Sequence, residues 1–190
     1  MYDMLAGIIA EGENYGNLVS DCKEKIQVEY VSANPTGPLH VGHGRGAAVG
    51  SALANLMKAA GMNVSREYYI NDAGNQINNL AASVNARYLE QLGQTVEFPE
   101  NGYHGHDIIE TAERIVRIYG DRFLNMSEEE RLKEFRTIAL KEKLAALKED
   151  LEAFNVTYDE WFSEQTLHDA NAIKNACDLL TERGYLYEEG

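Results

Sequence analysis

The residues best suited to chemistry are two histidines, His40 and His43, which flank a glycine in the sequence His-Val-Gly-His. Imidazoles three positions apart on the first turn of a helix can both point at one anion. The free N–H groups at a helix N-terminus also attract phosphate, and Gly42 leaves room for a flat group such as a purine ring. The pattern therefore predicts stabilisation of the charge on a nucleotide phosphate while it is attacked.

Other interpretations of these histidines are weaker. A purely structural role fits poorly with the surrounding Pro-x-Gly-Pro-Leu-His-x-Gly-His sequence. A metal site lacks a third ligand at a standard spacing. Gly42-x-Gly44-x-x-Ala47 formally fits the dinucleotide fingerprint, but that fingerprint begins directly after a strand, whereas a loop with two prolines intervenes here. A second histidine pair, in His104-x-His106-Asp107, lies in a Gly-rich stretch, and we expect an exposed loop there.

The elements that would position the histidines form a strand, loop, helix and strand. Residues 26–32 alternate and are β-branched, which predicts a strand. Residues 33–38 contain two prolines and a glycine and must turn. Residues 41–60, closed by Gly61, predict a helix, and residues 64–70 predict a second strand. Such a unit makes a parallel sheet, and ligands bind beyond the carboxyl ends of its strands.

The rest of the chain is predicted to be mostly helical. Helices are expected over residues 2–11, 73–92 and 168–183, with a loop over residues 93–105. Ser127 and Glu130 form a capping box that starts another helix. An apolar stripe at helical spacing follows it, made of Leu132, Phe135, Ile138, Leu144, Leu147, Leu151 and Phe154.

Composition excludes several classes of function. The 190 residues carry a net charge of −14, which argues against a general nucleic-acid or anionic-membrane binder. The apolar runs are too short to span a bilayer, and the N-terminus lacks the positive flank of a signal peptide. Cys22 and Cys177, without a Cys-x-x-Cys, predict neither a disulfide framework nor a zinc ribbon. We expect a cytoplasmic globular chain with no membrane partner and no structural metal.

Residues 33–43 resemble the ATP-binding signature of the class I aminoacyl-tRNA synthetases, and the flanking motifs are similar to the arginyl-tRNA synthetase family. The motifs that carry this resemblance are Val28-Glu29-x-x-Ser32-x-Asn34-Pro35, Gly44-Arg45, Asn71-Asp72-x-Gly74-x-Gln76 and Phe154-x-Val156-x-Tyr158-Asp159-x-Trp161-x-Ser163-Glu164.

The resemblance implies an α/β fold, a Rossmann-like parallel nucleotide-binding half-domain with a mostly helical insertion subdomain. Residues 1–25 would be a remnant of an N-terminal domain, residues 26–92 the first half of the catalytic domain and residues 93–190 the connecting insertion. It also implies two reaction steps. The arginine carboxylate attacks the α-phosphate of ATP and expels pyrophosphate, and the terminal ribose of tRNA(Arg) then takes the arginyl group. The implied partners are L-arginine, ATP with Mg²⁺ and tRNA(Arg), in a monomeric parent enzyme.

The resemblance also assigns site residues. The catalytic pair is His40 and His43, and the ATP-binding set is Thr36, Gly37, His40, Gly42 and His43. The arginine-binding set is Glu29, Ser32, Ala33, Asn34 and His43. Glu29 would hold the guanidinium, which demands a bidentate carboxylate, although a strand glutamate that simply faces outward is the commoner case.

Roles further along the chain stay open in the sequence. Asp72 and Gln76 are expected either to contact substrate or the tRNA end, or to cap a loop. Arg45 would meet phosphate or pair with a nearby acid, and Trp161 is expected in the core.

The sequence departs from the family in one large respect. The second class I signature, Lys-Met-Ser-Lys, is absent, and nothing resembles the second half of the catalytic domain or the anticodon-binding domain. We therefore expect a fragment that does not aminoacylate tRNA by itself and that self-associates through exposed edges. The alternatives are a stand-alone nucleotidylyltransferase that shares the His-x-Gly-His motif and a non-catalytic module that binds arginine or RNA.

Overall fold

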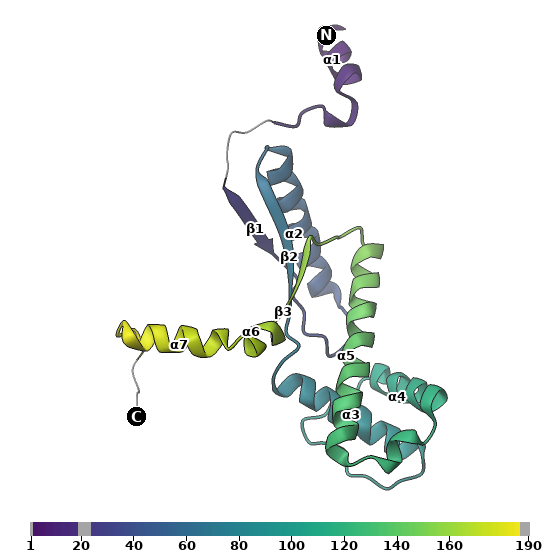
Figure 1. Ribbon diagram of the computed structural model, residues 1–190. Coiled ribbons are helices and arrows are strands. Elements are labelled where there is room, and N and C mark those ends of the chain that lie inside the picture. The colour runs from purple at the N-terminus through teal and green to yellow at the C-terminus, as the bar shows by residue number, and fades with distance from the viewer. Residues whose placement is uncertain (1, 19–23, 187–190) are drawn as a thin grey trace.

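The computed structural model describes residues 2–18 and 24–186 and contains one parallel sheet flanked by helices (Figure 1). Its strands are β1 (Lys25–Glu29), β2 (Asn63–Ile70) and β3 (Glu160–Ser163), in the order β1-β2-β3. Helix α2 (Val41–Ala59) connects β1 to β2. The connection from β2 to β3 holds α3 (Asn75–Gln91), α4 (His106–Tyr119) and α5 (Glu128–Ala153). The predicted α/β class with a parallel sheet is confirmed.

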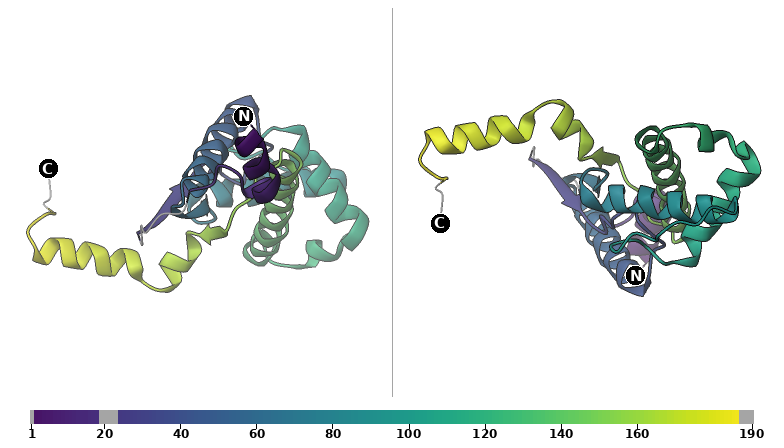
Figure 2. Two further views of the ribbon diagram at one scale, coloured as in Figure 1. Left: turned by 90° about the horizontal axis from the view of Figure 1, so that it is seen from above. Right: turned by 90° about the horizontal axis from the view of Figure 1, so that it is seen from below.

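The remaining elements are short or lie at the ends of the chain. Helix α1 (Tyr2–Glu11) is followed by the 3-10 turn η1 (Gly12–Asn14), and a second 3-10 turn, η2 (Arg122–Asn125), joins α4 to α5. Neither α1 nor α7 (Ala172–Glu182) contains a buried residue. Figure 1 shows α1 beyond one end of the sheet, and Figure 2 shows α7 projecting away from it. Within residues 2–18 and 24–186, no helix is long and apolar enough to cross a membrane.

The first strand is shorter than the sequence predicts. The strand was expected to continue to residue 32, and this was wrong, because β1 ends at Glu29. Val31 and Ser32 take positive φ angles of 68° and 41°, a conformation that a β-branched residue rarely adopts. The chain therefore leaves the sheet earlier and turns sharply into the loop that precedes α2.

Strand β3 was missing from the sequence prediction, and the final helix is interrupted. Four residues in a charged segment carry too little pattern to predict a strand, yet β3 pairs with β2 in parallel register. One continuous helix was expected over residues 168–183, and this was wrong. It is divided into α6 (Gln165–Asp169) and α7, because Asn171 adopts a left-handed φ of 52° between them.

Helix α5 belongs to two hydrophobic clusters. Its first half packs on α3 and α4 through Phe135 and Ala139, and its last turn packs on the sheet through Leu151. The predicted apolar stripe is interrupted by buried Lys143, whose ammonium group meets the carboxylate of Asp107. Phe154 was expected to be buried as the last residue of the stripe, and this was wrong, because Phe154 is 54% exposed. One long helix thus fixes the helical layer to the sheet.

Candidate functional site

The two histidines cap the N-terminus of α2 with their own rings. His40 is the N-cap, and its Nδ1 accepts a hydrogen bond from the N–H of Gly42 at 3.1 Å. Nδ1 of His43 accepts from the N–H of His40 at 3.2 Å. The rings stack with centroids 3.8 Å apart. Imidazole nitrogens here replace the Ser, Thr or Asp oxygen and the Glu of the usual capping box.

This capping fixes which ring nitrogen carries a proton. A nitrogen that accepts a backbone N–H must present a lone pair, so both Nδ1 atoms are unprotonated and both Nε2 atoms carry hydrogen. Burial, and to a smaller degree the neighbouring His40, lowers the pKa of His43 below its ordinary value. With Nδ1 of each ring turned to the backbone, the two stacked rings present their Nε2–H groups as donors for an anion.

Gly42 is required by this arrangement. A Cβ at this position would lie 2.9 Å from Cε1 and 3.0 Å from Nδ1 of His40, which is closer than non-bonded atoms approach. At Gly44, in contrast, a Cβ would meet nothing within 4 Å. Any side chain at residue 42 must displace the His40 ring from its capping position.

The loops that follow β1 and β2 meet at the carboxyl edge of the sheet. The buried Tyr68 hydroxyl donates to the carbonyl of Ala33 at 2.9 Å, and burial raises the pKa of Tyr68 to about 12. Oγ of Ser32 accepts from the N–H of Tyr69 at 3.0 Å. The side-chain amide of Asn71, which follows β2, approaches that of Asn34, which follows β1, to 3.3 Å. Strand β2 thus holds the predicted arginine-binding loop in place.

Glu29 lies at the end of β1 in a row of three glutamates. It is opposite Glu67 on β2, which in turn is opposite Glu160 on β3. Partners in register project from the same face of a sheet. Burial, followed by the charges of Glu160 and Glu29, raises the pKa of Glu67. The sequence analysis missed Glu67 and Glu160, because only the strand register shows that they adjoin Glu29.

Asp72 has a structural role in this chain. Its Oδ2 accepts from Oγ of Ser163 at 2.6 Å, and its Oδ1 accepts from the N–H of Gln165 at 2.9 Å, at the start of α6. The carboxylate therefore caps the segment that follows β3, as in the capping alternative considered for it. Gln76 is exposed in the first turn of α3, and Arg45 is exposed on α2.

The motif near the end of the chain joins β3 to β2. The guanidinium of Arg66 donates from Nε and Nη2 to the two carboxylate oxygens of Asp159, at 3.1 and 3.0 Å. These hydrogen bonds hold the pKa of the Asp159 carboxyl far below its usual range. Trp161 stacks on Tyr68 with centroids 4.4 Å apart. It was expected in the core, but it is only partly buried and packs against the cluster on the sheet.

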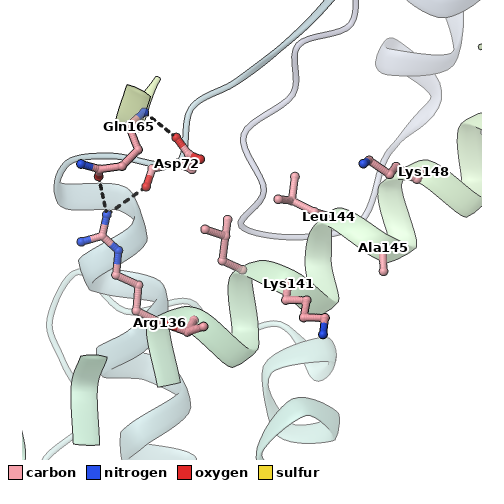
Figure 3. Close-up of a pocket in the computed structure, with 9 residues that line it drawn as sticks. Asp72, Arg136, Lys141, Leu144, Ala145, Lys148 and Gln165 are labelled. Carbon is pink, nitrogen blue, oxygen red and sulfur yellow. Dashed lines mark hydrogen bonds between the residues drawn. The ribbon is translucent and has the colours of Figure 1, made fainter. Parts of the chain in front are cut away.

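Cavities adjoin the signature, and a further one lies along α5. One of about 320 Å³ lies between the start of α2 and the end of α5, lined by Leu39, His40, Val41, Gly44, Ala47, Asp150, Leu151 and Phe154. The predicted ATP contact Gly37 lines a different, smaller cavity of about 150 Å³ against α4 and α5, and Thr36 is half-buried in the intervening turn. A third cavity, of about 640 Å³, extends along α5 (Figure 3).

The second histidine pair does not form a cluster. His104 contacts Phe98 with its ring tilted by 34°. His106 begins α4 and pairs with Glu110, and Asp107 pairs with Lys143. Among the residues that the structure describes, no group of three His, Cys, Asp or Glu side chains could hold a metal ion. Cys177 is free and exposed, while Cys22 lies outside the described residues.

Comparison with known proteins relates this geometry to one family. The family described as tRNA synthetases class I (R), catalytic domain, matches residues 4–184. The arginine–tRNA ligase of Carboxydothermus hydrogenoformans is 58% identical over 182 residues, covering 96% of this chain and 33% of the relative. The Listeria welshimeri ligase is 53% identical over 187 residues, covering 98% and 34%. The chain thus spans about a third of the length of the curated relatives it matches.

Solved structures agree with the sequence comparison. An arginyl-tRNA synthetase structure from Campylobacter jejuni superposes with a TM-score of 0.85 at 32% identity, covering 98% of this chain and 40% of that one. The Thermus thermophilus arginyl-tRNA synthetase gives a TM-score of 0.55 at 28% identity, covering 85% and 27%. The histidine-capped helix, the parallel sheet and these matches together show that the chain belongs to the class I (R) tRNA synthetase family, as part of its catalytic domain.

Proposed function

We propose that this chain supplies the arginine- and ATP-binding first half of the catalytic domain of an arginine–tRNA ligase. The observation that carries the proposal is the stacked pair of His40 and His43, which presents two Nε2–H donors at the open N-terminus of α2. The arginine carboxylate attacks the α-phosphate of ATP, a new C–O–P linkage forms, and pyrophosphate leaves. The terminal ribose of tRNA(Arg) then takes the arginyl group and releases AMP.

The histidines stabilise the negative charge that grows on the phosphate. Donors that are already oriented lose little order during the reaction, and one such donor contributes on the order of 3 kcal/mol to transition-state stabilisation. Because their Nδ1 atoms are occupied by backbone N–H groups, the rings act as neutral donors rather than as bases. Thr36 and Gly37 belong to the loop that leads the chain to this helix, and Gly42 allows the rings to stack.

Glu29 binds the guanidinium of arginine, and Glu67 supports it electrostatically. A planar guanidinium and a carboxylate pair through two parallel hydrogen bonds, which an ammonium group cannot reproduce. The row of Glu29, Glu67 and Glu160 concentrates negative charge on one face of the sheet, and a bound cation relieves that repulsion. Ser32, Ala33 and Asn34 then contact the amino and carboxylate groups of the amino acid.

Mg²⁺ enters this proposal only with its nucleotide. The described residues offer no group of three ligands for it, and magnesium is commonly held by substrate phosphates and water. No step of the proposed reaction is therefore assigned to a metal held by this chain. The remaining expectations, a connecting insertion over residues 93–190, a monomeric parent, self-association of this chain and a cytoplasmic location, stay predictions.

A domain exchange tests the proposal. The chain would replace the matching third of the Bacillus subtilis arginine–tRNA ligase, to which it is 52% identical over 186 residues. We expect arginine-dependent ATP–pyrophosphate exchange in the hybrid, and a loss of about 10²- to 10³-fold after His40→Ala or His43→Ala. A hybrid that unfolds cooperatively but shows no arginine-dependent exchange would contradict the proposal and favour the non-catalytic binding module. The stand-alone nucleotidylyltransferase alternative gains no support from the family assignment.

A further inference from the structure

A sharp turn at Val31 leads the chain from β1 into the loop that is proposed to bind arginine. The N–H of Ser32 donates to the carbonyl of Tyr30 at 3.0 Å, which closes a three-residue γ-turn with Val31 at its centre. Val31 has a φ of 68°. A γ-turn whose central φ is positive is rare and strained, and a β-branched residue is poorly suited to it. Such a turn persists only where its surroundings fix it.

The hydroxyl of Tyr158 fixes this turn from a distant part of the chain. It donates to the same Tyr30 carbonyl at 3.1 Å, across 128 positions of sequence. In return, the hydroxyl of Tyr30 donates to the carbonyl of Thr157 at 3.4 Å, and the two tyrosine rings pack with centroids 4.7 Å apart. The segment that leaves the end of α5 and leads into β3 (Figure 1) is thus joined twice to the first residue of the turn.

Tyr30 itself is confined by α2. A Cβ at Gly50, which is buried within α2, would overlap the Tyr30 ring, so this glycine allows the ring and the helix to approach closely. Val31 and Tyr158 both pack against the hydrophobic cluster that contains Tyr30. Among the described residues, the Tyr158 hydroxyl has no hydrogen-bond partner other than the Tyr30 carbonyl. Its polar contribution to the structure is therefore made at the turn.

The turn sets the direction of the loop that follows it. Because each residue contributes only two soft dihedral angles, a change of φ at Val31 redirects the backbone that follows. Strand β2 holds Ser32 and Ala33 by hydrogen bonds, but both of these act after the turn. Pro35 is fully buried, whereas Asn34 before it is exposed. The loop is thus fixed at the turn and at Pro35, and the side chain between them is open to a ligand.

We propose that Tyr158 is a positioning residue for arginine recognition, because its hydroxyl holds the γ-turn at Val31 and the turn holds residues 32–34 in the conformation that binds the amino acid. The inference rests on the proposed function, since it deepens the arginine site assigned there. Molecules with a released turn do not bind arginine, so the apparent affinity falls with the fraction in which the turn is formed. Buried Pro35 and the histidine caps of α2 separate the turn from the nucleotide end of the site.

Tyr158→Phe tests the proposal because it removes the hydroxyl and keeps the ring. It is made in the hybrid with the Bacillus subtilis ligase and assayed by ATP–pyrophosphate exchange. We expect the KM for arginine to rise by about fivefold, the factor that one net hydrogen bond supplies, while kcat and the KM for ATP stay close to those of the unaltered hybrid. A rise in KM at constant kcat marks the loss of uniform binding of that substrate, whereas partial unfolding would lower kcat.

Tyr88 supplies a matched control in the helical layer. Its buried hydroxyl donates to the carbonyl of Gly120 at 2.8 Å, and Tyr88 belongs to the other hydrophobic cluster. Tyr88→Phe therefore removes the same kind of hydrogen bond without touching the turn. It should lower the free energy of unfolding in urea about as much as Tyr158→Phe does, and it should leave the KM for arginine unchanged.

Val31→Gly tests the turn itself. Glycine adopts a positive φ without the steric cost that valine meets, so the turn depends less on the Tyr158 hydroxyl when residue 31 is glycine. The rise in the KM for arginine caused by Tyr158→Phe should therefore be smaller in the Val31→Gly background than in the unaltered hybrid.

Amide hydrogen exchange of the 190-residue chain, followed by NMR, supplies a measurement that needs no activity. The N–H groups of Ser32 and Tyr69 both form hydrogen bonds within the turn and loop. Both should exchange faster in Tyr158→Phe than in Tyr88→Phe, because local opening of the turn exposes them to solvent.

Each outcome decides the inference. An unchanged KM for arginine in Tyr158→Phe, an equal rise in Tyr88→Phe, or unchanged exchange at Ser32 and Tyr69 would overturn it. So would an equal effect of Tyr158→Phe with and without Val31→Gly. Arginine-dependent activity of the hybrid together with any of these results would leave the proposed function standing. A hybrid without such activity would contradict the proposed function and remove the arginine role, while faster amide exchange in Tyr158→Phe would still show that the hydroxyl orders the turn.

Discussion

Nδ1 of His43 accepts a hydrogen bond from the backbone N–H of His40 at 3.2 Å, and the two rings stack on each other. The side chains proposed to stabilise the phosphate are thus also the caps of the helix on which they lie. Folding of the first turn of α2 and orientation of both donors are consequently one event.

Gly42→Ala is predicted to disrupt the site without unfolding the chain. The added Cβ would lie 2.9 Å from the His40 ring and would force it out of the stack. A misplacement on the scale of 1 Å can lower activity about 10²-fold, and we expect a loss approaching that in the hybrid's pyrophosphate exchange. Gly44→Ala is the matched control, because its Cβ meets open space. Equal effects of the two substitutions would contradict the account.

The lowered pKa of His43 predicts how stability depends on pH. Burial and His40 lower the pKa in the folded chain, while the unfolded chain keeps a value of about 6.5. The folded state therefore binds fewer protons, so the His43 contribution is fully present above about pH 6.5 and is lost as pH falls toward the folded pKa. Urea unfolding of the chain and of His43→Gln between pH 5 and 8 should show a smaller decline in the variant. Parallel curves would argue against the depressed pKa.

Some of this geometry was available from the sequence and some was not. The strand, helix and strand around His40 were predicted because alternation and helix-ending glycines are local signals. The early end of β1 was not, since nothing in the sequence marks Val31 for a left-handed φ. Strand β3 is too short to show a pattern, and its existence depends on pairing with β2.

The same contrast holds for the candidate site. His40 and His43 are close in sequence, so their spacing alone places them together. Glu67 and Glu160 adjoin Glu29 only through the strand register. The carboxylate of Asp72 accepts hydrogen bonds from Ser163 and Gln165, which lie more than 90 positions further along the chain. Sequence reasoning finds residues that are near one another along the chain and misses those that the sheet brings together.

The glutamate row predicts that Glu67→Gln stabilises the chain. Burial and the charges of Glu160 and Glu29 raise the pKa of Glu67. The ionised Glu67 carboxylate therefore destabilises the folded chain at neutral pH, and the folded chain gains stability as pH falls through the raised pKa and the carboxylate is protonated. Removing the charge should raise the free energy of unfolding at pH 7.5 by about 0.5 kcal/mol, the scale of one cross-strand pair. Chemical denaturation measures it, and a destabilised variant would refute the repulsion inferred here.

The Arg66–Asp159 pair predicts a defined loss of stability. Asp159→Asn removes a charge that receives two guanidinium hydrogen bonds, and because Asp159 is 39% exposed we expect destabilisation of only about 1 kcal/mol. The Asp159 pKa is depressed, so this contribution is present above its ordinary value near 3.8 and is lost as pH falls below it. Asp178→Asn, which removes an exposed pair on α7, is the control and should change stability little. A thermal unfolding shift of the same size in both variants would exclude a special role for Asp159.

Calorimetric titration of the chain with a non-hydrolysable arginyl-adenylate analogue tests the central claim most directly. Lysyl and leucyl analogues, together with the Glu29→Gln and His43→Ala variants, serve as comparisons. The account predicts selective binding of the arginyl analogue, loss of its preference over the lysyl analogue in Glu29→Gln, and weaker binding of the shared adenylate portion in His43→Ala. Binding of all three analogues with equal affinity, or arginyl selectivity that survives Glu29→Gln, would contradict it.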